Sequence, residues 1–197
     1  MTPPRRSRYG YRSRPRTWPS AAALAGVLAA PVLALALLAG LGRWLPEVQS
    51  ATRTASFPEP PDVVWQLLLD LDTQPTWRRG LTRVERLPDQ QGRPAWLEYR
   101  GGAAEAFWIA DARPPLRLVT ERVPATGPAE ASWTWELARE AEGSRLTLTR
   151  RVRVEQPVAR AIGMIMRGPG READRALADL GQRLAAAERT RTTALNR

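Results

Sequence analysis

The alternation of hydrophobic and polar positions divides the chain into three parts. Residues 21–42, "AAALAGVLAAPVLALALLAGLG", contain no charged side chain. From 51 to 155, short stretches alternate apolar and polar residues, which is typical of strands with one buried face. From 156 to 188, apolar residues recur at helical spacing. The pattern therefore predicts an apolar N-terminal helix, a sheet and a long C-terminal helix.

The apolar stretch is long enough to cross a membrane. As a helix it measures about 33 Å, against a hydrocarbon core of roughly 30 Å. Trp18 and Trp44 flank it, as interfacial tryptophans do. We expect an arginine-rich tail over 1–20, a single transmembrane helix over 21–44 and a linker over 45–50.

The arginines predict the orientation of this helix. Six of them precede the apolar stretch, whereas only Arg43 follows it closely. The positive-inside rule then puts the N-terminus in the cytoplasm and the C-terminal domain outside it. A cleaved signal peptide is the alternative, although the apolar run is longer than the roughly 7–15 residues usual for one.

The remaining sequence predicts one α+β domain over 51–188. A strand at 51–57 precedes three prolines and two short helices, the second of which ends near Trp77. A meander of six strands follows at 81–87, 95–100, 103–112, 116–123, 132–140 and 145–155. We expect the glycine–proline–glycine at 168–170 to kink or interrupt the final helix, and 189–197 to form a polar tail.

Several of these stretches resemble one family. "PEPPDVVWQLLLDLDTQPTW", "VERLPDQQGRPAWLEY" and "WTWELAREAEGSRLTLT", with the long C-terminal helix, resemble the START-like (SRPBCC) superfamily in its polyketide cyclase/dehydrase and lipid-transport branch. The resemblance covers about residues 51–188. It implies a helix-grip fold, in which a curved antiparallel sheet packs on the C-terminal helix with a cavity between them. It supplies no catalytic residue that can be transferred to this chain.

Strand alternation gives candidate ligand contacts. We place the apolar face of each strand inside and the charged face outside, so that Glu98, Arg100, Glu105 and Glu136 point outward. The expected ligand-binding residues, with the first at the mouth of the cavity, are then Trp77, Leu97, Tyr99, Trp108, Trp133, Trp135 and Leu148. That these residues simply form core is the open alternative.

The composition limits the available chemistry. The chain contains neither cysteine nor histidine, which excludes thiolate nucleophiles, imidazole bases and Cys/His zinc sites. We find no phosphate-binding glycine loop and no metal-ligand spacing, so we expect no cofactor and no metal. Asp70 and Asp72 are interpreted as capping or surface residues, and no two carboxylates share an inner face. We therefore assign no catalytic residue.

The net charge of +10 does not predict nucleic-acid binding. Residues 1–50 account for +6 of it and residues 51–197 for +4, and every basic residue is an arginine. The body lacks a basic stripe interleaved with aromatic residues. Nucleic acid is therefore not an expected partner.

Three functional hypotheses follow. The first is a membrane-anchored binding protein that holds a hydrophobic small molecule, such as a lipid or an isoprenoid, between the sheet and the final helix. The second is a cyclase or aromatase acting on a polyketide-like substrate, which requires a buried carboxylate or tyrosine in the cavity. The third is an envelope protein with a collapsed cavity whose surface binds another protein. The sequence leaves the oligomeric state undetermined.

Overall fold

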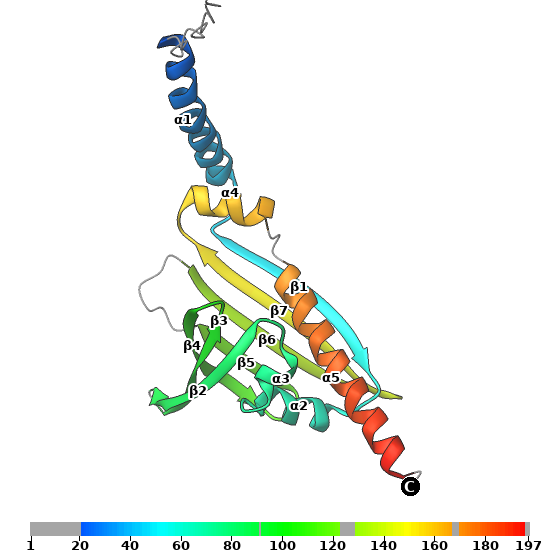
Figure 1. Cartoon of the computed structure of the whole chain (residues 1–197). Coiled ribbons are helices and arrows are strands. Elements are labelled where there is room, and N and C mark those ends of the chain that lie inside the picture. The colour runs from blue at the N-terminus through cyan, green and yellow to red at the C-terminus, as the bar shows by residue number, and fades with distance from the viewer. Residues whose placement is uncertain (1–20, 91, 123–128, 167–169, 196–197) are drawn as a thin grey trace, which may run out of the picture. The chain divides into compact units, whose positions relative to one another are not determined.

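The computed structural model describes residues 21–90, 92–122, 129–166 and 170–195 (Figure 1). The chain divides into two compact units, residues 1–37 and residues 38–197. The second unit contains the whole sheet and the helices packed on it.

Seven strands form one antiparallel sheet in the order β1-β7-β6-β5-β4-β3-β2. Consecutive strands from β2 to β7 are neighbours, and β1 pairs with β7 to form the edge of the sheet opposite β2. The predicted meander and curved antiparallel sheet are confirmed. The strands are β1 (Val48–Phe57), β2 (Leu81–Gln90), β3 (Arg93–Arg100), β4 (Ala103–Arg113), β5 (Arg117–Arg122), β6 (Ala129–Glu140) and β7 (Gly143–Val154).

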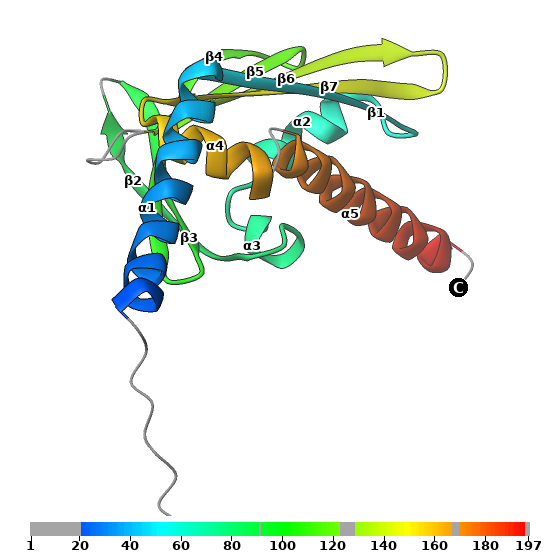
Figure 2. The same cartoon turned by 90° about the horizontal axis from the view of Figure 1, so that it is seen from above.

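Helices cover one face of the sheet. Figure 2 shows α2 (Pro61–Leu69), α3 (Gln74–Trp77) and α5 (Arg171–Leu195) on the same side. Their apolar side chains and the inner face of the sheet form the main core, because burial of apolar surface is the dominant stabilising term. The core includes Phe57, Val64, Trp65, Leu68, Leu118, Leu137, Leu146, Leu148, Leu177, Leu180 and Leu184.

The predicted final helix is two helices. α4 (Pro157–Met166) ends before the glycine–proline–glycine segment, and α5 begins after it. The expected interruption is confirmed, while residues 167–169 themselves lie outside the described residues. α5 also continues through most of the predicted polar tail, where the hydroxyl groups of Thr190 and Thr193 donate to carbonyls four residues earlier.

The N-terminal helix α1 comprises Ala21–Trp44. Within the described part of the chain, no helix is both long and apolar enough to span a membrane. The arginine-rich tail over 1–20 lies outside the described residues. The predicted linker is shorter than expected, because β1 already begins at Val48, opposite Arg153 of β7.

We predict that Gly143 at the β6–β7 turn does not tolerate a side chain. Its φ is +110°, and an added Cβ would lie 2.0 Å from the carbonyl oxygen of Phe57. Gly143→Ala should lower the free energy of unfolding by about 1 kcal/mol, because alanine is strained at a positive φ. The clash of the added Cβ with the Phe57 carbonyl should cost roughly 1–3 kcal/mol more. Gly102→Ala is the matched control, because Gly102 has a φ of +86° and open space around it. If the two variants lost the same free energy of unfolding in urea denaturation, the backbone around Gly143 would have moved to accommodate the added Cβ, which would contradict the prediction.

Candidate functional site

A cavity of about 690 Å³ lies between the sheet and the helices α2, α3 and α5. Its volume falls within the range of small-molecule pockets. Strands β3 to β6 supply one side, and α5 supplies the other. The apolar lining residues are Leu68, Leu69, Leu71, Trp77, Pro94, Trp96, Phe107, Ile109, Leu118, Trp133, Trp135 and Ala176.

Three aromatic rings from strands β3, β4 and β6 line one side of this cavity. Trp96 of β3 stacks on Phe107 of β4, with ring centroids 6.0 Å apart and planes 18° apart. Phe107 in turn contacts Trp133 of β6 at 5.3 Å and a 60° tilt. We call these three residues the aromatic wall. Offset and tilted arrangements are the favourable ones for aromatic pairs, so the three rings form a continuous apolar surface.

The cavity also has a charged floor, which we call the buried ion cluster: Arg78, Glu98 and Arg100. The Glu98 side chain is only 3% exposed. Arg78 Nη1 donates to Glu98 Oε1 at 2.6 Å, and Arg100 Nη2 donates to Oε2 at 2.9 Å. Trp96 Nε1 adds a longer contact to Oε1 at 3.4 Å. One buried carboxylate thus holds two guanidinium groups at the cavity surface.

Electrostatics keep Glu98 ionised. Burial raises the pKa of Glu98, but the charges and hydrogen bonds of Arg78 and Arg100 outweigh it, and the pKa lies below its ordinary value. Burial also lowers the pKa of Arg78, and the Glu98 carboxylate opposes that shift. The floor is therefore a set of fixed charges at neutral pH.

The turn between α2 and α3 positions Arg78. The Gln74 side chain is buried and donates Nε2 to the carbonyl of Leu68 at 2.9 Å, which satisfies an otherwise unpaired carbonyl at the end of α2. Its Oε1 accepts from Arg78 Nη1. Asp70 accepts from the Thr73 hydroxyl at 2.8 Å, and Asp72 pairs at the surface with Arg86. The expected capping or surface roles of both aspartates are confirmed.

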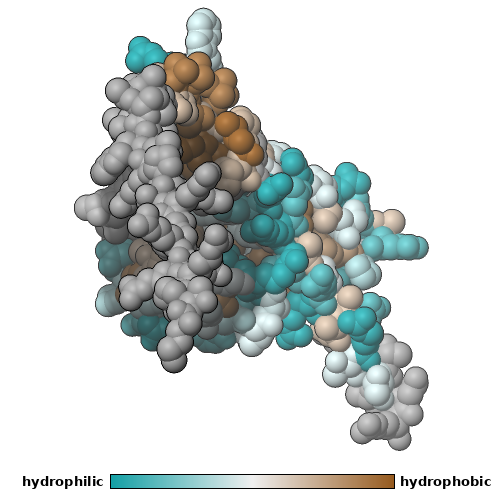
Figure 3. Space-filling view, turned by 45° about the horizontal axis from the view of Figure 1, so that its top comes forward, coloured by the Kyte–Doolittle hydropathy of each residue, from teal (hydrophilic) through white to brown (hydrophobic). Residues whose placement is uncertain are grey.

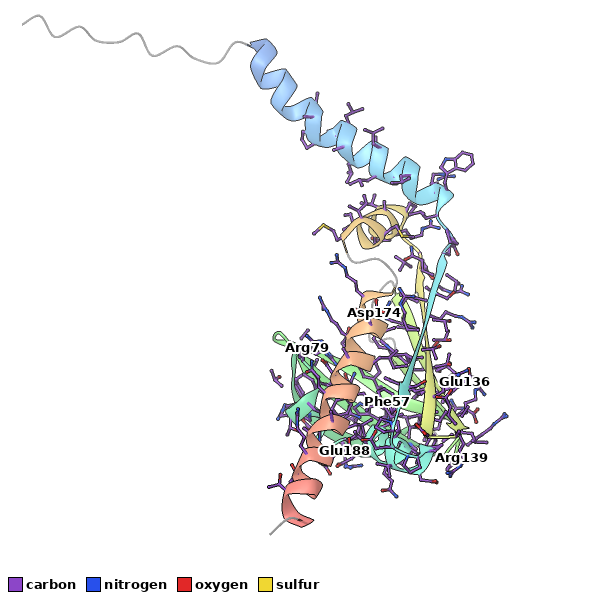
Figure 4. The ribbon with its side chains drawn as sticks, turned by 90° about the vertical axis from the view of Figure 1, so that its right-hand side faces the viewer. Phe57, Arg79, Glu136, Arg139, Asp174 and Glu188 are labelled. Atoms are coloured by element: carbon purple, nitrogen blue, oxygen red, sulfur yellow. The ribbon has the colours of Figure 1, made fainter. Side chains whose placement is uncertain are left out.

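Three ion pairs hold α5 against the rest of the domain. They join it to β1 (Arg53–Asp174, 2.6 Å), to β7 (Arg150–Glu172, 2.7 Å) and to the α3–β2 loop (Arg79–Asp179). Asp179 is buried and also accepts from the backbone N–H of Arg79 at 2.9 Å. Figure 4 shows Arg79 beside α5 and Asp174 near its start. We call these pairs the α5 ion pairs.

The carboxylates that line the cavity are all paired with arginine. Glu98 belongs to the buried ion cluster, and Glu172 and Asp179 belong to the α5 ion pairs. Glu105 pairs with Arg122 at 2.8 Å. Among the described lining residues, no carboxylate is therefore left without a cationic partner.

Three of the predicted ligand contacts line the cavity. Trp77 comes from α3, and Trp133 and Trp135 come from β6. Leu148 of β7 is fully buried in the core and is not among the lining residues. A ligand-binding role for these residues stays a prediction.

The other three predicted contacts lie on the outer face, and their placement inside is wrong. Trp108 donates to Glu121 at 3.0 Å, and the Tyr99 hydroxyl donates to Glu85 at 3.0 Å. Leu97 shares the parity of Tyr99 and pairs with Ala106 across the β3–β4 ladder. Side chains on β3 and β4 do alternate between the two faces of the sheet, as predicted. However, the residues that point inward are the ones we expected to point outward.

The physical reason is charge compensation. We assigned Glu98 and Arg100 to the outside because isolated charges avoid the interior, yet here they neutralise each other inside. The cavity-lining residues of these two strands that the sequence analysis did not predict include Trp96, Glu98, Arg100, Phe107 and Ile109. The sequence did contain a signal for Trp96 and Phe107. Both are large aromatic residues, and both have the strand parity opposite to that of Leu97, Tyr99 and Trp108, which we placed inside.

Arg150 was missed for a related reason. It has the parity of Leu146, Leu148 and Val152, so it projects from the inner face of β7 toward α5. Its guanidinium lies 5.5 Å from the Trp133 ring centroid and pairs with Glu172. The glutamate that compensates its charge is 22 residues away in sequence, and strand alternation contains no information about it.

A known protein family matches most of the domain. The family model described as "Polyketide cyclase / dehydrase and lipid transport" matches residues 48–185. No curated protein matches the chain.

Solved structures share the fold. An aromatase/cyclase from Streptomyces sp. R1128 superposes with a TM-score of 0.57 at 19% identity, over 72% of this chain and 94% of that one. A START superfamily protein from Mycobacterium smegmatis gives a TM-score of 0.57 at 15% identity, over 70% of this chain and 98% of that one. The di-domain ARO/CYC from the BE-7585A biosynthetic pathway gives a TM-score of 0.58 at 14% identity. The match covers 82% of this chain but only 60% of that protein. A second di-domain ARO/CYC, from the steffimycin pathway, is covered over 50% of its length.

We predict that the buried ion cluster makes stability depend on pH. Because the folded pKa of Glu98 is lowered, its contribution is present above the ordinary value of 4.5 and is lost as pH falls through the folded pKa. Glu98→Gln should cost about 3 kcal/mol at neutral pH, since it leaves two guanidinium groups uncompensated. The difference from wild type should shrink below about pH 4.5 in urea denaturation.

Glu136→Gln is the matched control for this prediction. The Glu136 side chain is 55% exposed on the outer face of β6, and Figure 4 shows it on the side of the sheet away from α5. Its replacement should change the free energy of unfolding by less than about 0.5 kcal/mol. A Glu98→Gln variant that behaved like this control at every pH would contradict the assigned role of the cluster.

Proposed function

Because the chain belongs to the polyketide cyclase/dehydrase and lipid transport family, we propose that its cavity binds a hydrophobic small molecule. The finer part of the proposal is that the ligand is lipid-like or isoprenoid-like and has one oxygen-bearing end. The observation that carries it is a cavity of about 690 Å³ with an aromatic wall on one side and a charged floor.

The apolar lining supports an apolar body for the ligand. Tryptophan, phenylalanine, leucine and isoleucine side chains surround most of the space. Burial of an apolar ligand there would favour binding by about 25 cal/mol for each Å² of apolar surface removed from water. Ala176 on α5 contributes a small side chain that leaves room opposite the sheet. A collapsed interior, as the third hypothesis requires, does not agree with this volume.

The polar groups support an oxygen acceptor at one end. Trp77 lines the cavity, and its indole Nε1 is buried without a hydrogen-bond partner among the described residues. Buried donors are normally satisfied, so a ligand oxygen is a suitable acceptor. Arg78 and Arg100 add guanidinium donors that Glu98 holds at the cavity floor.

One observation favours the enzyme hypothesis as a second candidate. Glu98 is a buried carboxylate on the cavity surface, as a cyclase or aromatase requires. However, Arg78 and Arg100 hold its pKa below the ordinary value, which suits an electrostatic role better than proton donation near neutral pH. Binding without chemistry is therefore the primary proposal.

We predict that filling the cavity from α5 abolishes ligand binding. Ala176→Phe places a ring in the space beside the aromatic wall and should lower ligand occupancy at least tenfold. Occupancy is read by native mass spectrometry of the full chain extracted from membranes, with lipid analysis of the bound mass. Ala178→Phe on the exposed side of α5 is the control and should retain the ligand.

Two results would count against the binding proposal. One is a wild-type chain that carries no bound mass and takes up nothing from a panel of lipids, isoprenoids and aromatic polyketides. The other is unchanged occupancy in Ala176→Phe, which would place the ligand elsewhere on the molecule. Conversion of a panel compound to a product of different mass would instead support the enzyme candidate.

The N-terminal sequence supports a separate proposal about location. We propose that the segment over 21–44 anchors the protein in a membrane, with the N-terminus in the cytoplasm and the domain on the other side. The uncharged run and the six arginines before it support this. The chain should resist carbonate extraction from membranes, and protease added to the non-cytoplasmic face should cleave the domain. Release by carbonate would contradict anchoring.

A further inference from the structure

α4 carries an exposed apolar face that no described residue covers. Ile162, Ile165 and Met166 recur at i, i+3 and i+4, which puts them on one side of the helix. They are 45%, 64% and 65% exposed, whereas Ala161 is fully buried toward the domain. Figure 3 shows apolar side chains gathered in one area of the surface, with polar ones over much of the rest.

Close contacts fix α4 to the last turn of α1 within the 38–197 unit. A Cβ added to Gly42 would lie 1.8 Å from the carbonyl oxygen of Pro157, so glycine is what allows the two backbones to approach. The buried Arg160 donates Nη1 to the carbonyl of Leu45 at 3.0 Å and Nη2 to that of Glu155 at 3.3 Å. The orientation of the exposed face is therefore set by the fold.

The same end of the unit presents further apolar groups. Trp44 is 90% exposed and Leu41 is 49% exposed, both on the turn of α1 that holds α4. Tryptophan is the residue most typical of membrane–water interfaces. This surface also follows directly in sequence from the uncharged run over 21–42.

Charge distinguishes a lipid surface from other occupants. From 156 to 171 the sequence contains three arginines and no acidic residue. Arg160 is buried, whereas Arg171 is exposed, as is Arg43 on the adjacent turn of α1. An apolar helix face bordered by cations is the pattern of helices that lie in the interface of anionic bilayers.

We propose that α4 and the last turn of α1 dock on the surface of an anionic lipid bilayer. Ile162, Ile165 and Met166 insert at the boundary between headgroups and acyl chains, and the exposed Arg43 and Arg171 contact lipid phosphates. The proposal does not depend on what the cavity binds. It also stands whether or not α1 crosses the bilayer, because it concerns the face of α4.

Spin labelling of the full chain tests this directly. The chain has no cysteine, so Ile165→Cys gives a unique labelling site, and Met166→Cys provides a second one. Arg139→Cys is the control; its side chain is 69% exposed, and Figure 4 shows Arg139 at the far end of the sheet from α4. The probes are vesicles of phosphatidylcholine with and without phosphatidylglycerol.

The readout is access of the nitroxide to a water-soluble nickel chelate and to oxygen dissolved in lipid. With phosphatidylglycerol vesicles, labels at 165 and 166 should lose chelate access several-fold and gain oxygen access, while the label at 139 stays unchanged. Chelate access at 165 and 166 that equals the control in vesicle-bound protein would overturn the proposal. So would protection without vesicles accompanied by dipolar coupling between labels, which would identify a second copy of the chain as the occupant.

Discussion

The placement of one carboxylate inside the sheet determines how the cavity is built. Glu98 lies on the inward face of β3, where an unpaired charge would cost several kcal/mol, and it is retained because Arg78 and Arg100 donate to both of its oxygens. Because β3 pairs in register with β4, this orientation also turns Trp96 and Phe107 inward. The aromatic wall and the charged floor are thus consequences of the same strand parity.

The opposite parity would give a different molecule. Leu97, Tyr99 and Trp108 would then line the interior, and the arginine–glutamate pairs would lie in water, where ion pairs contribute little. Tyr99 and Trp108 are satisfied on the outside by Glu85 and Glu121, and the Arg83 guanidinium lies 4.0 Å from the Tyr99 ring centroid. The outer face of the sheet therefore has its own aromatic–charge contacts.

Local patterns were sufficient to predict the architecture but only part of the site. Each strand and the break in the final helix follow from alternation, prolines and glycines, which act over a few residues. Trp133 and Trp135 were placed correctly because their strand alternates cleanly between polar and apolar positions. The inward parity of β3 and the role of Arg150 depend on partners 20 or more residues away, so no local pattern contains them.

The α5 ion pairs make the packing of α5 over the cavity sensitive to salt. α5 forms one side of the cavity, and each of its three ion pairs contains at least one well-exposed side chain. Exposed pairs weaken with added salt, whereas the apolar contacts of Leu180 and Leu184 do not. Added salt would thus weaken the contacts that hold α5 at the rim of the cavity while leaving the apolar core in place, so the rim responds to the medium around the protein.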